Sequence, residues 1–131
     1  MQIKEYAKRL KLSWIPANYH TVEAKTNEEY LLKIFEHEVQ HRDERKINLL
    51  MKQATLPKIP DKPFDWKDIQ FAPGVTREYI LEGKFIEKQE NLIFYGGVGT
   101  GKTFLSTLIA LNTIKKQGKR VKFFTSAAIV N

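Results

Sequence analysis

The predicted fold depends most on residues 91–131, NLIFYGGVGTGKTFLSTLIALNTIKKQGKRVKFFTSAAIVN. Within this stretch, the short apolar run Leu92–Tyr95 is typical of a buried parallel strand. Leucine and isoleucine at helical spacing predict a helix over residues 102–116, with a glycine just beyond it as the stop. Residues 121–124 predict a second strand, and residues 126–131 the first turn of another helix. Strand, loop, helix and strand together predict an α/β fold built on a βαβ unit.

The eight residues between the first predicted strand and the helix, GGVGTGKT, match the G-x-x-x-x-G-K-[ST] pattern of a Walker A phosphate loop, or P-loop. Glycines permit positive φ values and let backbone N–H groups approach a polyphosphate closely. The N-terminus of the following helix adds partial positive charge. The predicted nucleotide-binding residues are Gly96, Gly97, Val98, Gly99, Thr100, Gly101, Lys102 and Thr103.

The expected ligand of this loop is ATP with Mg²⁺. Lys102 is expected to reach the β and γ phosphates, and the Thr103 hydroxyl to bind Mg²⁺ beside phosphate oxygens. The alternative interpretation is a glycine-rich structural turn that carries an incidental Lys-Thr pair.

The residues ahead of this unit predict three parts: a helical N-terminal region at 1–55, a proline-rich linker at 56–74 and, from residue 75, the start of the P-loop domain. Apolar residues at helical spacing predict a helix near residues 3–10 and a long helix to about Gln53. The long helix is expected to open with a Thr26-x-x-Glu29 capping box. A short helix at about 18–25 is also expected.

The linker is punctuated by prolines, and its aromatic residues are candidate contacts with a neighbouring surface. These residues are Phe64, Trp66 and Phe71. The segment from Val75 to about Glu87 predicts a further helix, interrupted near Gly83.

A second motif, His37-Glu38-Val39-Gln40-His41, matches the H-E-x-x-H pattern of zinc proteases. The helical context favours a structural interpretation, in which both histidines edge the apolar stripe and Glu38 pairs with Arg42 one turn later. We therefore assign no zinc ligand. In the zinc interpretation, the third ligand stays open, with Asp61, Asp65 and Asp68 as the candidates.

Charge and cysteine content narrow the class of protein. The 131 residues carry a formal net charge of +7 and contain no cysteine, which excludes disulfides and thiolate metal sites. No apolar run approaches the ~20 residues that span a bilayer, and the N-terminus lacks a signal-peptide core, so we expect a cytoplasmic protein without membrane contact. Basic clusters are candidate DNA-backbone contacts: Arg42, Arg45 and Lys46, then Lys115, Lys116, Lys119 and Arg120.

Residues 91–131 resemble the opening of the ATPase domain of IstB-like proteins, the ATP-binding transposition helpers of insertion sequences. These are relatives of the DnaC helicase loaders within the AAA+ class. The upstream stretch NEEYLLKIFEHEVQHRDERKINLLMKQATLP, followed by the proline-punctuated aromatic segment, resembles the helical N-terminal region of the same family. The resemblance therefore covers nearly the whole chain.

The resemblance implies a protein that binds ATP and DNA, forms oligomers when full length, and works with a transposase. A replicative helicase is the alternative partner, if the chain is a helicase loader. A small-molecule P-loop kinase and a non-catalytic helical DNA-binding module are the other functional classes that the residues leave open.

One feature departs from the resembled family. AAA+ hydrolysis needs an acidic strand motif, but this sequence contains no Asp or Glu after Glu90. Only the first two strands of the family's sheet are expected, and these are not neighbours in it, so their edges are expected to be unpaired. The chain therefore looks like a truncated helper, and we expect it to hydrolyse ATP poorly or not at all.

Overall fold

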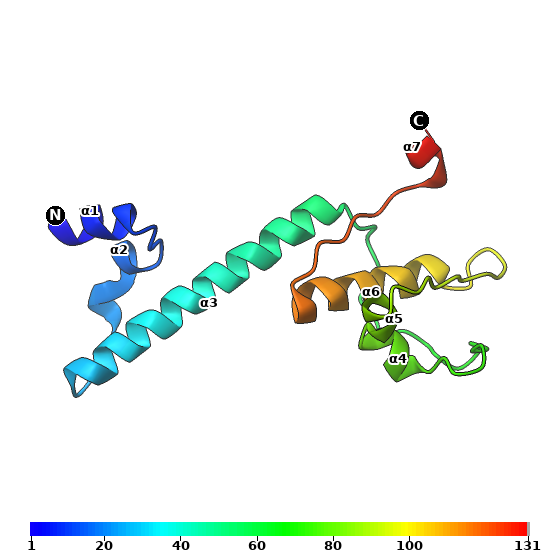
Figure 1. Cartoon of the computed structure of the whole chain (residues 1–131), viewed down its shortest axis with the longest axis horizontal. Coiled ribbons are helices and arrows are strands. Elements are labelled where there is room, and N and C mark those ends of the chain that lie inside the picture. Colours follow the sequence, from blue (N-terminus) through cyan, green and yellow to red (C-terminus); the bar gives the residue numbers. More distant parts are fainter. Residues whose placement is uncertain (131) are drawn as a thin grey trace. The chain divides into compact units, whose positions relative to one another are not determined.

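The computed structural model describes residues 1–130, and over that range the chain consists of helices joined by loops (Figure 1). Two compact units are present, Met1–Asn48 and Leu49–Asn131. The helices are α1 (Gln2–Arg9), α2 (Ile15–Asn18), the 3-10 turn η1 (Tyr19–Thr21), α3 (Asn27–Ala54), α4 (Arg77–Leu81), α5 (Lys84–Glu87), α6 (Lys102–Gln117) and α7 (Ser126–Val130).

The predicted βαβ unit, and with it the α/β fold class, is wrong for the described residues. Neither 92–95 nor 121–124 forms a strand. A strand requires a neighbour that satisfies its backbone N–H and C=O groups, and these two segments do not pair. Instead, Leu92 and Phe94 pack their side chains against the core of the second unit. The Phe123 N–H donates to the carbonyl of Ala54 at 2.9 Å.

In the unit Met1–Asn48, the short helices α1 and α2 contact each other, and the turn between them is bonded to α3. Figure 1 shows both beside the long helix. Ala7 of α1 and Ile34 of α3 are buried. The short helix expected at 18–25 lies earlier, at α2 and η1, because Pro16 occupies the first turn of α2, where its fixed φ and missing N–H are tolerated.

Helix α3 is a single helix of 28 residues, as its apolar periodicity predicted. Its start confirms the predicted capping interaction. The Glu29 N–H donates to Thr26 Oγ1 at 3.1 Å, and the Glu29 carboxylate accepts the Lys25 N–H at 2.9 Å. The same carboxylate pairs with Lys33 one turn later at 3.0 Å. The Lys25 N–H, followed by Lys33, lowers the pKa of Glu29 below its ordinary value of 4.5.

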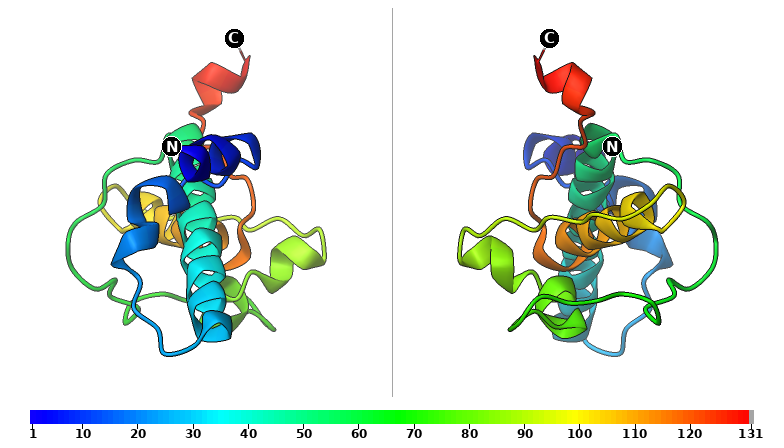
Figure 2. Two further views of the ribbon diagram at one scale, coloured as in Figure 1. Left: turned by 90° about the vertical axis from the view of Figure 1, so that its left-hand side faces the viewer. Right: turned by 90° about the vertical axis from the view of Figure 1, so that its right-hand side faces the viewer.

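In the unit Leu49–Asn131, the core forms where α6 meets α4 and the proline-rich segment. Ile80, Leu105 and Ile109 are buried at its centre. Phe64 and Trp66 pack against this cluster, which confirms that aromatic residues of the segment attach it to a neighbouring surface. Figure 2 shows the chain before the glycine loop running alongside α6 and then turning back into that helix.

Two glycines with left-handed backbones set the ends of helices in this unit. Gly83, at a φ of 72°, separates α4 from α5, which is the interruption that the sequence predicted. Gly118, at a φ of 62°, follows the last residue of α6, and its N–H donates to the Ile114 carbonyl at 3.0 Å. This is the predicted glycine stop.

Candidate functional site

The glycine loop, residues Gly96–Thr103, connects the extended segment 91–95 to the first turn of α6. Gly99 and Gly101 have φ values of 77° and 92°, in the left-handed region that glycine adopts without strain. Thr100 Oγ1 donates to the Gly97 carbonyl at 2.7 Å and closes the turn. Val98 at the tip is fully exposed. Two of the four loop glycines therefore adopt the left-handed conformation that glycine permits.

Helix α6 begins at Lys102, immediately after the loop, and no side chain caps its N-terminus. The first intrahelical bond of this end runs from the Leu105 N–H to the Gly101 carbonyl. The N–H groups ahead of Leu105 have no intrahelical acceptor, as at every helix N-terminus. They can therefore bind an anion placed at the loop, with the helix dipole in support.

The ammonium group of Lys102 lies over the loop. Its Nζ donates to the carbonyls of Gly96 and Gly97, the second at 2.9 Å. The neighbouring Thr103 side chain is exposed, and its hydroxyl makes no hydrogen bond within residues 1–130. The lysine and the hydroxyl thus stand at the helix start, where a phosphate group could meet both.

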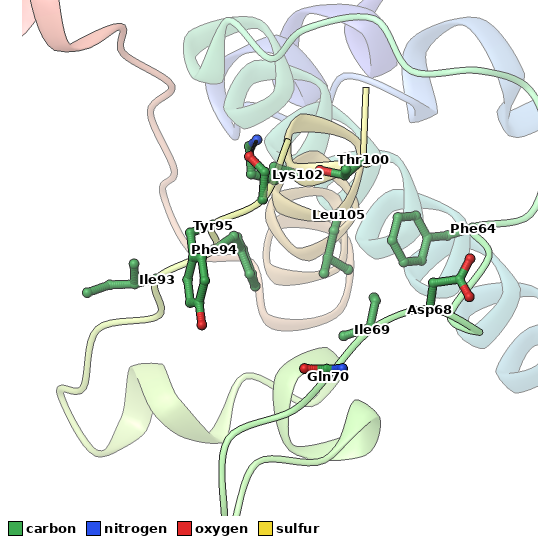
Figure 3. Close-up of a pocket in the computed structure, with 12 residues that line it drawn as sticks. Phe64, Asp68, Ile69, Gln70, Ile93, Phe94, Tyr95, Thr100, Lys102 and Leu105 are labelled. Atoms are coloured by element: carbon green, nitrogen blue, oxygen red, sulfur yellow. Dashed lines mark hydrogen bonds between the residues drawn. The ribbon is translucent and has the colours of Figure 1, made fainter. Parts of the chain in front are cut away.

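A cavity of about 320 Å³ opens beside the loop (Figure 3). One wall comes from the extended segment that leads into the loop, and the opposite wall comes from the proline-rich segment. Lys102 and Leu105 of α6 complete the lining. The other lining residues are Phe64, Asp68, Ile69, Gln70, Ile93, Phe94, Tyr95, Gly96, Thr100 and Gly101. Ligand pockets of this kind combine apolar walls with a few polar groups.

Phe64 fixes the proline-rich segment against the loop. Its ring meets that of Phe104 edge to face, with centroids 5.2 Å apart, and meets Trp66 in the same way at 5.0 Å. A Cβ built on Gly101 would lie 3.2 Å from Phe64 Cε2. Glycine at position 101 therefore provides both the left-handed backbone and the space for this ring. The sequence indicated Phe64 as a contact residue but not as a wall of the cavity.

The H-E-x-x-H residues have a structural arrangement that differs from the predicted one. The predicted Glu38–Arg42 ion pair is wrong, because Arg42 Nη2 donates to the Lys11 carbonyl at 2.8 Å. The buried Glu38 carboxylate instead accepts backbone N–H groups of residues 13–15. His37 stacks on Trp14, with ring centroids 4.4 Å apart. Residues 1–130 contain no group of three or more His, Asp or Glu side chains arranged to hold a metal ion.

The basic residues predicted to contact DNA belong to separate units. The first group lies on α3 in the unit Met1–Asn48, where the guanidinium of Arg45 donates to Ser13 Oγ at 3.2 Å. The second group lies in the last turn of α6 and just beyond it, in the other unit, and Lys115 and Lys116 are exposed in that turn. The remaining members are Lys46, Lys119 and Arg120.

Across residues 1–130, no helix is both long enough and apolar enough to cross a lipid bilayer.

Comparison with known proteins points to one family. Residues 7–131 match the family described as "IstB-like ATP binding protein". The chain is 32% identical over 139 aligned residues to "Insertion sequence IS5376 putative ATP-binding protein" of Geobacillus stearothermophilus, covering 99% of this chain and 54% of that protein. It is 34% identical over 92 residues to the IS232 protein of the same description from Bacillus thuringiensis subsp. berliner, covering 68% of this chain and 36% of the relative.

A third relative, "Insertion sequence IS21 putative ATP-binding protein" of Pseudomonas aeruginosa, is 33% identical over 98 residues. The match covers 72% of this chain and 36% of the relative. The chain thus spans about a third to a half of the length of these curated relatives.

Proposed function

The chain belongs to the family of IstB-like ATP-binding proteins, and from this membership we propose that residues Gly96–Thr103 form its Walker A loop. In this proposal the loop binds ATP with Mg²⁺ and the protein acts as a helper of DNA transposition. One observation carries the site assignment. The uncapped N-terminus of α6, the Lys102 ammonium and the glycine loop converge beside one cavity.

The helix start, Lys102 and Thr103 each have a defined part in the proposed complex. The N–H groups of the first turn of α6 bind phosphate oxygens, and Lys102 exchanges its loop carbonyls for the β and γ phosphates. The free hydroxyl of Thr103 binds Mg²⁺, a cation that prefers oxygen ligands. The adenosine part occupies the cavity, where apolar side chains such as Phe64 and Ile69 face it and Gln70 offers polar atoms.

We propose transposition rather than helicase loading as the process. All three relatives are described as insertion-sequence proteins, which supports this choice. A transposase and DNA are the proposed partners, and the cytoplasm is the proposed location. Residues 1–55 serve as the helical N-terminal region, 56–74 as the linker and 75–131 as the start of the nucleotide-binding domain in this scheme.

The magnesium part of the proposal is tested with Thr103→Val, which removes the hydroxyl and keeps the β-branched shape. We expect the wild-type chain to bind a fluorescent ATP analogue more tightly with Mg²⁺ than with EDTA, and the variant to lose that difference. Ser106→Ala, one turn along α6, is the matched control because its hydroxyl is bonded to the Thr103 carbonyl. A Mg²⁺ effect retained in Thr103→Val would contradict the assignment of Thr103.

The process itself is tested by affinity capture. The immobilised chain is expected to retain a transposase encoded in the same insertion sequence and to leave a replicative helicase unbound. Retention of the helicase alone would favour the helicase-loader alternative.

A further inference from the structure

A second cavity, in the unit Met1–Asn48, is surrounded by cations. It has a volume of about 580 Å³ and is lined by Lys4, Lys8, Lys11, Leu12, Ser13, Pro16 and Arg45. No acidic residue belongs to this lining. We call it the basic groove. None of its lining residues belongs to the glycine loop. Of its cations, the sequence predicted only Arg45 as a DNA contact.

The cations of the basic groove have no carboxylate partners. The ion pairs formed within residues 1–130 involve Lys33 and Lys84, and neither belongs to this cavity. Lys4, Lys8, Lys11 and Arg45 are all exposed. Lys4 and Lys8 are four residues apart on one helix, where like charges repel one another. An anion placed among these cations would lower the electrostatic free energy of the group. The groove is therefore complementary to a polyanion.

Hydrogen bonds hold the backbone of the turn beside the groove and the side chain of Arg45. Lys11 has a left-handed φ of 57°, and the next N–H, of Leu12, donates to the Ala7 carbonyl at 2.8 Å. Arg42 donates to the Lys11 carbonyl, and Arg45 to the Ser13 hydroxyl. Buried Glu38 binds the next backbone N–H groups. The turn that carries Lys11 is thus hydrogen-bonded to α3 in the absence of a ligand.

We infer that the basic groove binds the phosphate backbone of DNA. Lys4 and Lys8 stand one helical turn apart, a rise of about 6 Å, so the two ammonium groups can each reach a different phosphate of a DNA backbone. The lining has no aromatic ring on which a base could stack, and no amide or carboxylate that could bind a base edge. Phosphate contacts carry no base sequence, so the inferred contact does not depend on the base pairs of the duplex.

This inference rests on the proposed function, since it takes DNA as a partner of the protein. It adds the place of contact and the kind of contact. It also separates Arg42 from Arg45, which the sequence predicted together as DNA-backbone contacts. Arg45 lines the groove, and its Nη1 donates to Ser13 Oγ, which leaves its other N–H groups for a phosphate. Arg42 donates to the Lys11 carbonyl and is not part of the lining.

The test is the triple variant Lys4→Gln, Lys8→Gln and Lys11→Gln in the full 131-residue chain. Glutamine keeps much of the aliphatic stem and a good helix propensity, so only the charge is removed. The matched control is Lys25→Gln, Lys62→Gln and Lys67→Gln, which makes the same change in net charge at exposed lysines outside the groove. Binding to a short labelled duplex is followed by fluorescence anisotropy over a series of salt concentrations.

For the groove variant we expect at least about tenfold weaker binding at low salt. The salt slope should fall by about 0.9 for each of the three phosphates that a lysine no longer neutralises. The control variant is expected to retain the wild-type slope, and two unrelated duplex sequences to bind the wild type equally. Equal affinity and slope in the two triple variants, or no duplex binding by the wild type, would overturn the inference.

A competing acidic partner is resolved in the same experiment. If poly-glutamate binds the wild type, loses affinity in the groove variant and leaves duplex binding unchanged, the groove is a site for acidic peptides and the DNA inference is wrong. ATP binding is measured in parallel for all variants. Because the groove lysines lie outside the glycine loop, a failure of the groove inference leaves ATP binding intact, whereas a failure of the proposed nucleotide site removes it from the wild type as well.

Discussion

The carboxylate of Glu38 accepts the backbone N–H of Ser13 at 2.8 Å, across 25 residues of sequence. The same carboxylate accepts the N–H of Trp14 at 3.0 Å and that of Ile15 at 3.1 Å. Glu38 is only 3% exposed. One buried side chain therefore satisfies the backbone where α2 begins and joins it to α3. This relationship explains the glutamate of the H-E-x-x-H pattern without a metal ion.

Replacing Glu38 by glutamine should destabilise the unit Met1–Asn48 by about 2–3 kcal/mol, because the amide removes the negative charge and sets a donor against backbone donors. Urea unfolding followed by circular dichroism measures the change in free energy. Glu36→Gln is the matched control, since Glu36 is exposed on the same helix and makes no hydrogen bond within the described chain. Equal stability of the two variants would show that the buried carboxylate contributes nothing.

The capping carboxylate of Glu29 should make the start of α3 sensitive to acid. Hydrogen bonds from the Lys25 N–H and from Lys33 hold its pKa below the ordinary 4.5. A carboxyl whose pKa is lower in the folded state contributes stability above its unfolded pKa and loses it as the pH falls through the folded pKa. The destabilisation caused by Glu29→Gln should therefore be largest near neutral pH. It should decrease as the pH falls below the ordinary glutamate pKa and through the lower folded pKa.

Amide hydrogen exchange of the first turn of α3, measured at several pH values, checks this expectation. Glu28→Gln serves as the control because it removes a charge from the same turn, where Glu28 makes no hydrogen bond among the described residues. If the two variants respond identically to pH, the effect belongs to the helix dipole rather than to the cap.

Gly101 is expected to tolerate alanine poorly. Its φ of 92° is unfavourable for a residue with a Cβ, and that Cβ would press on the Phe64 ring at 3.2 Å. We expect Gly101→Ala to cost about 1–3 kcal/mol of stability. Gly97→Ala is the control, because its nearest contact would be an ordinary 3.8 Å, to Thr100 Cγ2, and we expect a change within about 0.5 kcal/mol. Thermal unfolding of both variants measures the two changes in stability. A smaller loss of stability in Gly101→Ala than in Gly97→Ala would contradict the strained geometry.

The helices could be predicted from the sequence because their determinants are local. The periodicity of α3, its Thr26–Glu29 start and the glycine after α6 all act within a few residues. The two predicted strands failed for the opposite reason. An apolar run such as Leu92–Tyr95 becomes a strand only if another segment pairs with it, and here its side chains serve the core of a helical unit instead.

The candidate site likewise has a part that the sequence predicted and a part that it did not. The motif located the glycine loop and Lys102, because spacing along the chain determines both. The far wall of the cavity comes from Phe64, Asp68 and Ile69, well upstream in the chain, and only the aromatic content of that segment hinted at a contact. The role of Glu38 was equally hidden, since its partners are backbone groups distant in sequence.

The central claim is that ATP binds at the glycine loop through Lys102, and isothermal titration calorimetry of ATP with Mg²⁺ tests it most directly. The wild-type chain should bind, and Lys102→Ala should bind about ten- to hundredfold more weakly, since hydrogen bonds between an ammonium and phosphates are lost. Lys115→Ala, at the other end of α6, should bind as the wild type does. Unchanged affinity in a folded Lys102→Ala protein would contradict the account.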